Sequence, residues 1–210
     1  MKVILVNGSP HEKGCTYTAL ETVAKTLNEE GIETEIFQLG TKPLVGCTAC
    51  GACAKTGRCV FDDRVNEFLE LAEEADGFVF GSPVHYASAG GAIVSFMARA
   101  FFAGSNSAKM PFTLKPAAAV VSARRAGTTA AFDQLNKYFT ISQMPVISSR
   151  YWNMVHGTKP EDVANDAEGL QIMRVLARNM AWFLKCKEAG KKAGVPFPKK
   201  EETIRTNFIR

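Results

Sequence analysis

The sequence of 210 residues lacks several features that would place it in common classes of protein. No apolar run approaches the roughly 20 residues that a membrane-spanning helix needs. The chain opens with MKVILVNGSP, a strand pattern that no signal-peptide cleavage site follows. The net charge is only +4, and no basic face interleaved with aromatic residues indicates nucleic-acid binding. We therefore expect a cytoplasmic protein that binds neither a membrane nor a nucleic acid.

Internal repeats and interdomain linkers are also absent from the sequence. Hydrophobic residues make up 46% of the chain, which is enough for one sizeable core. We expect one domain over residues 1–190. The lysine-rich residues 191–210 are expected to form a polar, solvated C-terminal tail.

Short apolar runs alternate along the chain with segments of helical periodicity. Strands are predicted over residues 2–6, 32–39, 77–83, 116–123 and 144–152. Helices are predicted over residues 18–30, 64–75, 89–102, 128–139 and 160–185. Strands separated by helices predict a doubly wound α/β fold, with a five-stranded parallel sheet and helices on both faces.

The composition of the predicted strands indicates their order in the sheet. The second strand is the most polar, as an edge strand should be, and the first and third are the most apolar. This pattern suits the strand order 2-1-3-4-5. A ligand crevice is then expected at the carboxyl ends of strands one and three, where the winding of the sheet reverses direction.

Three loops with binding chemistry follow strands at this predicted edge. The first, NGSPHEKGCTYTAL, can present N–H groups and hydroxyls to an anion, although an ordinary capped turn explains it equally well. It has neither a Walker A ending nor a GxGxxG pattern. The second, GSPVHYASAGG, has two flat polar rings and two glycines, which suit a planar ligand. The third, SARRAGTT, has two arginines that can bind phosphate or remain solvated.

Four of the six cysteines fall within residues 46–60, with the spacing Cys47-x2-Cys50-x2-Cys53-x5-Cys59. A CxxCxxC run is typical of iron–sulfur ligation, whereas zinc sites more often use two separated CxxC pairs. In a reducing compartment such clusters more often bind metal or do redox work than form disulfides. The alternative is a lid whose thiols are free or zinc-bound. The other two cysteines are expected to lie outside the set.

The three loops, the third read on as SARRAGTTAAFDQLNKYF, resemble the flavodoxin-like NAD(P)H-dependent FMN reductase family. The resemblance extends from residue 1 to about residue 185, and the cysteine run resembles the iron–sulfur flavoprotein branch of that family. It implies a flavodoxin-like fold with bound FMN. It also implies a [4Fe-4S] cluster held by Cys47, Cys50, Cys53 and Cys59.

The resemblance further implies which residues surround the FMN. The phosphate is expected at Ser9, His11, Cys15, Thr16 and Tyr17. The ring is expected along Pro83, Val84, His85 and Tyr86, with Ser122, Arg124 and Gly127 near it. The family often has Asn where this chain has Cys15, and a thiol is a weak donor, so the backbone N–H must bind there. The basic residue that the family often has at His11 is also missing.

By this resemblance the chain is expected to be an FMN-dependent oxidoreductase, in which the flavin carries the chemistry and no side chain is singled out as a catalytic acid or base. Electrons would come from NAD(P)H or ferredoxin and pass to a small-molecule or flavin acceptor, with a cluster as relay. The alternative is a non-enzymatic electron carrier or redox sensor that ferredoxin reduces. The family's assemblies and the apolar segment AGGAIVSFMARAFFAG predict a homodimer or homotetramer.

Overall fold

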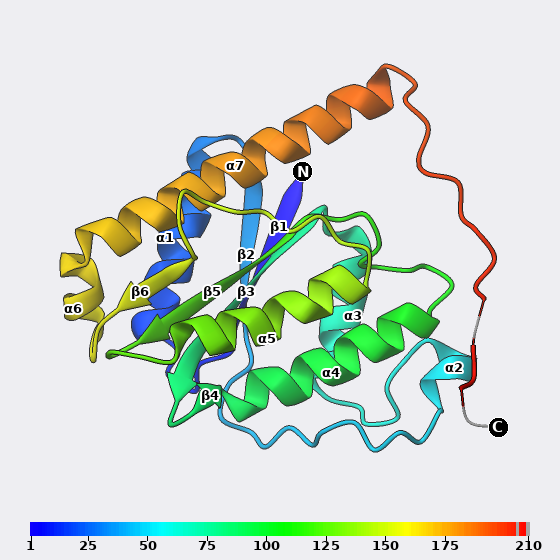
Figure 1. Ribbon diagram of the computed structural model, residues 1–210, viewed down its shortest axis with the longest axis horizontal. Coiled ribbons are helices and arrows are strands. Elements are labelled where there is room, and N and C mark those ends of the chain that lie inside the picture. The colour runs from blue at the N-terminus through cyan, green and yellow to red at the C-terminus, as the bar shows by residue number, and fades with distance from the viewer. Residues whose placement is uncertain (205, 209–210) are drawn as a thin grey trace.

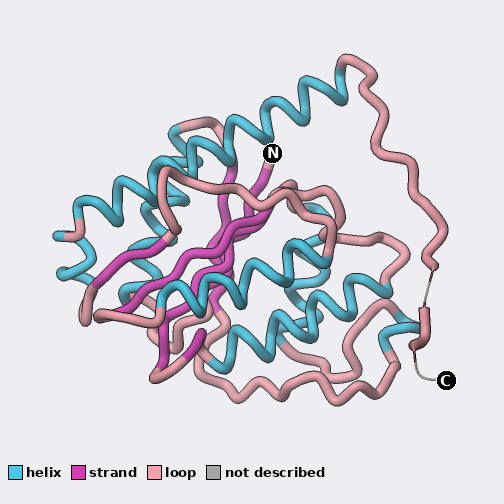
Figure 2. Tube along the Cα trace, viewed as in Figure 1, coloured by secondary structure: helices cyan, strands magenta, loops and turns pink. Residues whose placement is uncertain are grey.

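The computed structural model describes residues 1–204 and 206–208 of the chain. A parallel sheet lies between two groups of helices, as the ribbon and the tube both show (Figures 1 and 2). The parallel strands stand in the order β2-β1-β3-β5-β6, which confirms the predicted order 2-1-3-4-5. Their bounds are β1 Lys2–Asn7, β2 Glu33–Gln38, β3 Gly77–His85, β5 Ala117–Ala123 and β6 Met154–His156. The short strand β4, Ser88–Ala89, pairs antiparallel to the end of β3 and was not predicted.

Helices cover both faces of the sheet, so the central strands are buried on both sides and read as continuous apolar runs. In β1, Val3 and Leu5 belong to one core cluster, while Ile4 and Val6 belong to the other. The first face carries α1 Cys15–Glu29, α6 Pro160–Asn165 and α7 Ala167–Lys192. The second carries α3 Arg64–Glu74, α4 Gly91–Asn106 and α5 Thr128–Ile141. The short helix α2, Cys53–Thr56, lies in the cysteine loop beside α4.

The last strand is not where the sequence predicted it. Residues 144–152 contribute only one isolated bridge to the sheet, from Val146 to Ala117, and the strand itself is β6. Pro145 has no N–H to donate to a strand ladder, so this segment cannot pair regularly. Its apolar residues Met144 and Ile147 are buried in the core without regular strand pairing, which is why the segment resembled a strand.

The predicted final helix over residues 160–185 is two helices. Asp166 ends α6 and caps α7, since its carboxylate accepts a hydrogen bond from the N–H of Gly169 at 2.9 Å. Helix α7 then continues to Lys192, into the segment predicted as tail. Within the described residues, none of the helices combines the length and hydrophobicity of a membrane span.

Close packing at Gly8 brings the loop after β1 against its neighbours. The N–H of Gly8 donates to the carbonyl oxygen of Gly81 at 2.9 Å. A Cβ at Gly8 would lie 2.6 Å from Cβ of Ile93 on α4, so no larger residue fits without a shift. The absence of a side chain therefore lets this loop, β3 and the start of α4 meet at one edge of the sheet.

Candidate functional site

The carboxyl ends of β1, β3 and β5 meet at one edge of the sheet, and the three predicted loops follow them there (Figure 1). The first loop, residues 8–14, connects β1 to α1. The second is the turn between β3 and β4, and the third, residues 124–127, connects β5 to α5. Topology alone therefore gathers the three loops that the sequence singled out.

Two side-chain amides hold the first loop in place by hydrogen bonds. Asn7 accepts a hydrogen bond from the N–H of Ser9 at 3.1 Å and donates to Gln38 at 2.6 Å. Gln38 in turn donates to the carbonyl oxygen of Ser9 at 2.8 Å. The hydroxyl of Ser9 accepts the N–H of His11 at 3.1 Å. Sequence reasoning missed Asn7 and Gln38, although a polar residue that ends a buried strand, as Asn7 does, is a usable signal.

Two of the predicted site residues come together beneath this loop. The hydroxyls of Thr16 and Ser122 are both buried and lie 2.8 Å apart. Their hydrogen bond ties the first turn of α1 to the end of β5. Gly14 precedes α1 and supplies no side-chain cap, so the backbone N–H groups of the first turn face the loop without a competing side chain.

The other predicted phosphate residues point elsewhere. The thiol of Cys15 donates to the carbonyl oxygen of Gly157 at 3.6 Å, and burial raises its pKa, so it stays protonated. The hydroxyl of Tyr17 donates to Glu21 along α1 at 3.1 Å. His11 is exposed at the surface of the loop. The side chain of Cys15 is thus engaged within the fold, and phosphate binding by its backbone N–H stays a prediction.

The second and third loops form one rim at the same edge. Val84 packs so closely on Gly127 that a Cβ there would lie 3.0 Å from its Cγ1, and Gly127 has a φ of +91°. His85 and Tyr86 are exposed, and Tyr86 has a φ of 57°, a conformation that costs a non-glycine residue on the order of 1 kcal/mol. Arg124 is exposed as well. The rim therefore exposes the polar side chains of His85, Tyr86 and Arg124 at the same edge of the sheet as the first loop.

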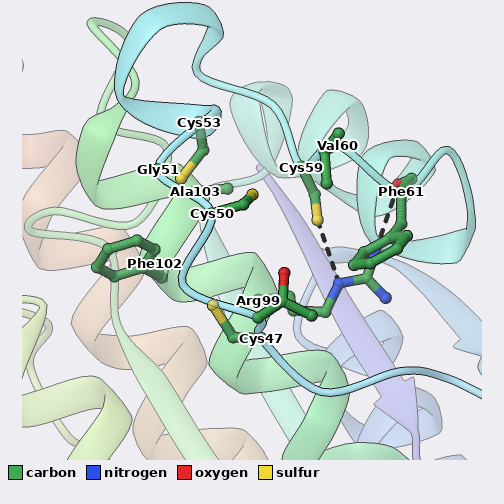
Figure 3. A pocket seen from close by; sticks show the side chains of 11 residues that line it. Cys47, Cys50, Gly51, Cys53, Cys59, Val60, Phe61, Arg99, Phe102 and Ala103 are labelled. Carbon is green, nitrogen blue, oxygen red and sulfur yellow. Dashed lines mark hydrogen bonds between the residues drawn. The ribbon is translucent and has the colours of Figure 1, made fainter.

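The four clustered cysteines line a single pocket (Figure 3), near the opposite end of α4 from this rim (Figure 1). The wall of the pocket is largely apolar, and includes Phe61, Arg99, Phe102 and Ala103. Cys47 and Cys50 are exposed, Cys59 is half-buried and Cys53 is buried at the start of α2. Burial raises the pKa of the Cys53 thiol, and the three neighbouring cysteines add to the rise.

Arg99 on α4 connects the cysteine loop to the rest of the protein. Its residue exposure is 2%, and all five of its N–H groups have acceptors. Two bonds at 2.8 and 2.9 Å go to the carboxylate of Asp63, and the Nε–H points to Sγ of Cys59 at 3.2 Å. The remaining two go to the carbonyl oxygens of Val45 and Phe61 at 3.3 Å. Sequence reasoning missed Arg99, yet an arginine inside an otherwise apolar helix is a visible signal.

Asn66 on α3 holds the backbone of the same cysteine. Its side-chain oxygen accepts the N–H of Cys59 at 2.9 Å, and its amide donates to the carbonyl oxygens of Cys59 and Phe61 at 3.0 and 3.1 Å. The residue is only 3% exposed. Asn66 therefore fixes the main chain of Cys59 while Arg99 contacts its sulfur.

The pocket gathers four thiols, the donor type of both iron–sulfur and zinc sites. Among the described residues, no group of three or more His, Cys, Asp or Glu side chains is close enough to hold one metal ion. Gly51 and Gly57 have φ values of +71° and +67°, which allow tight turns within the cysteine loop.

Comparison with known proteins decides the family. The sequence matches the profile described as NADPH-dependent FMN reductase over residues 1–159. The chain belongs to the NADPH-dependent FMN reductase family. The matched region of this FMN reductase family member includes the three loops and the cysteine run, and it stops before α6.

Individual relatives agree with this assignment. An iron–sulfur flavoprotein of Methanocaldococcus jannaschii is 32% identical over 194 residues, covering 88% of this chain and 98% of that protein. A NAD(P)H:quinone oxidoreductase from Methanothermobacter marburgensis has a TM-score of 0.65 at 18% identity, covering 86% and 96%. A flavodoxin from the domain Archaea has a TM-score of 0.58 at 16% identity, covering 88% and 99%. The two structural likenesses show that the fold of this FMN reductase family member is flavodoxin-like.

The buried bond between Thr16 and Ser122 yields a test of how the site is assembled. Thr16→Val and Ser122→Ala are each expected to lower the free energy of unfolding by about 1–3 kcal/mol. Each removes one hydroxyl and leaves the other, which is buried, without its hydrogen-bond partner. The double variant is expected to lose less than the sum, by about 1 kcal/mol. Urea denaturation of the flavin-free protein measures all three.

Thr22→Val on the same helix is the matched control. Its hydroxyl donates only to the carbonyl oxygen of Thr18 within the helix, so the expected change is under about 0.5 kcal/mol. Strictly additive losses for the Thr16 and Ser122 variants would contradict the coupling.

Proposed function

We propose that this protein is an FMN-dependent oxidoreductase that takes electrons from NAD(P)H or reduced ferredoxin. The observation that carries the proposal is the family match over all three loops, which the fold brings to one edge. Bound FMN supplies both hydride and single-electron transfer. Its acceptor would be a small molecule or a second flavin.

The residues of the edge divide the binding of FMN between phosphate and ring. Backbone N–H groups of the first loop and the first turn of α1 would bind the phosphate, at Ser9 and Thr16 in particular. Positions 11 and 15 are His11 and Cys15, so neither supplies a lysine or arginine to the phosphate. The N-terminus of α1 would therefore contribute most of the electrostatic attraction for the phosphate. The exposed rings of His85 and Tyr86 would lie against the flavin ring, beside Gly127.

We propose further that Cys47, Cys50, Cys53 and Cys59 hold a [4Fe-4S] cluster, which supplies one-electron transfer when bound. Four thiols in one apolar pocket support this ligand set. The name iron–sulfur flavoprotein of the 32% identical relative supports it independently. Arg99 and Asn66 would fix Cys59 for ligation before any metal arrives.

A non-enzymatic electron carrier is the second candidate. Cys47 and Cys50 are exposed, so a cluster bound there would be open to a protein partner such as ferredoxin. The two candidates share the cofactors and ferredoxin as a possible donor, but only the enzyme would turn over NAD(P)H with an added acceptor. Oxidation of a pyridine nucleotide therefore separates them.

Assembly and location complete the proposal. We propose that residues 1–190 form one FMN-binding domain, with residues 191–210 as a tail, in a homodimer or homotetramer. Tyr151, Trp152 and Trp182 are 52–68% exposed, which supports burial of their rings by a second copy. A cytoplasmic location suits thiols that must stay reduced before they bind iron.

The flavin and the donor are tested together. Flavin-free protein is expected to bind riboflavin about 10- to 100-fold more weakly than FMN, because riboflavin lacks the phosphate and its charge-assisted bonds. Quenching of flavin fluorescence measures both affinities. The FMN-loaded protein is expected to oxidise NAD(P)H steadily when an acceptor is added.

Each result bears on a different part of the proposal. Equal affinity for riboflavin and FMN would contradict the phosphate role of the first loop. Reduction by ferredoxin with no oxidation of NAD(P)H would favour the electron carrier over the enzyme.

The cysteine set is tested by substitution with a control on the same chain. Wild-type protein prepared without oxygen is expected to contain about four iron and four sulfide per chain. Cys50→Ser is expected to lose most of both, because serine oxygen replaces one thiolate ligand. Cys186→Ser is expected to keep them, since Cys186 is exposed on α7, outside the pocket. Equal iron in the two variants, or zinc in place of iron, would contradict the ligand set.

A further inference from the structure

Cys59 differs from the other three cysteines of the pocket in how it is held. Cys47 and Cys50 are exposed. The sulfur of Cys53 has a contact at 3.9 Å with the amide of Asn106, which is long for a hydrogen bond. Cys59 alone is held at both its backbone and its sulfur by buried polar side chains, Asn66 and Arg99.

The guanidinium of Arg99 cannot rotate away from Cys59 without breaking its other hydrogen bonds. Its other four N–H groups are bound to oxygen acceptors, two of them to both oxygens of Asp63. Such a bidentate pair fixes the plane of the guanidinium. The four other hydrogen bonds of the guanidinium therefore direct its Nε–H at the sulfur.

We propose that Arg99 is a positioning residue that donates its Nε–H to the sulfur of Cys59 and thereby sets the reduction potential of a cluster held in this pocket. The inference rests on the proposed function of the four cysteines. It adds which ligand is tuned, by which side chain, and in which direction.

The direction follows from charge. Adding one electron to a thiolate-bound cluster increases its negative charge by one unit, and hydrogen bonds to the sulfurs and nearby charges change the potential at which this happens. A buried cation that donates to a ligand sulfur favours the reduced form, and low exposure limits its screening. Asp63 opposes part of this effect, because its carboxylate offsets the charge of Arg99.

The central experiment is an anaerobic redox titration of the cluster-loaded protein, followed by electron paramagnetic resonance. Arg99→Gln removes the charge and the Nε–H donor, so its midpoint potential is expected to shift to more negative values than that of the wild type. Lys55→Gln is the matched control. It removes a positive charge from the same loop, but Lys55 is exposed on α2, so its potential is expected to stay at the wild-type value.

Two further variants separate the sulfur bond from a general loss of order. Asp63→Asn keeps an N-cap acceptor for the N–H of Val65 and leaves the cation of Arg99 uncompensated, so the potential is expected to shift to more positive values. Arg99→Lys keeps the charge without the fork, and is expected to recover part of the shift seen with glutamine.

The outcomes distinguish this inference from the proposal on which it rests. Wild-type protein that binds no cluster overturns the ligand set, and with it this inference, before any variant is made. Wild-type and Arg99→Gln proteins with equal potentials overturn the inference alone. If Arg99→Gln does not retain a cluster, Asp63→Asn decides, and a potential that does not become more positive overturns the proposed role of Arg99.

Discussion

The ion pair between buried Arg99 and half-buried Asp63 is the interaction on which the cysteine loop depends. The long segment between β2 and α3 has little regular structure of its own, and the pair joins it to two helices. Asp63 also caps α3 by accepting the N–H of Val65 at 3.1 Å. Taking a cation out of water is costly unless every donor is satisfied, and here all five are. One side chain thus fixes Val45, Cys59 and Phe61 relative to the core.

Helix α4 relates this pocket to the flavin edge. Its start at Gly91 adjoins the β3–β4 hairpin, while Phe102 and Ala103 near its other end form part of the cysteine pocket. Between Gly91 and Ala103 the helix rises about 18 Å at 1.5 Å per residue. Both candidate sites are therefore built on one rigid, buried element. A change in the packing of α4 would therefore alter the geometry of both sites.

Local patterns predicted most of the fold. The apolar runs of β1 and β3 and the polar run of β2 led to the correct strand order, because burial on two faces leaves a clear mark on composition. The last strand was wrong because Met144 and Ile147 are apolar and buried without regular pairing around Pro145. The break at Asp166 was missed because the helical pattern continues on both sides of it.

The site was only partly predictable, for a different reason. The loops that follow strands can be found from the sequence, since topology brings strand ends together. The residues that hold those loops act over long separations: Gln38 reaches Ser9 and Arg99 reaches Cys59. Nothing in the local sequence names such partners. Only the packed structure shows that Asn66 on α3 and Arg99 on α4 both hydrogen-bond to Cys59.

The most direct test of the account is a visible absorption spectrum of the protein purified without oxygen. We expect flavin bands over a broad iron–sulfur shoulder that bleaches on reduction. Flavin bands without the shoulder would contradict the cluster and leave an FMN reductase with a cysteine lid. A spectrum without flavin would contradict the central claim that this edge of the sheet binds FMN.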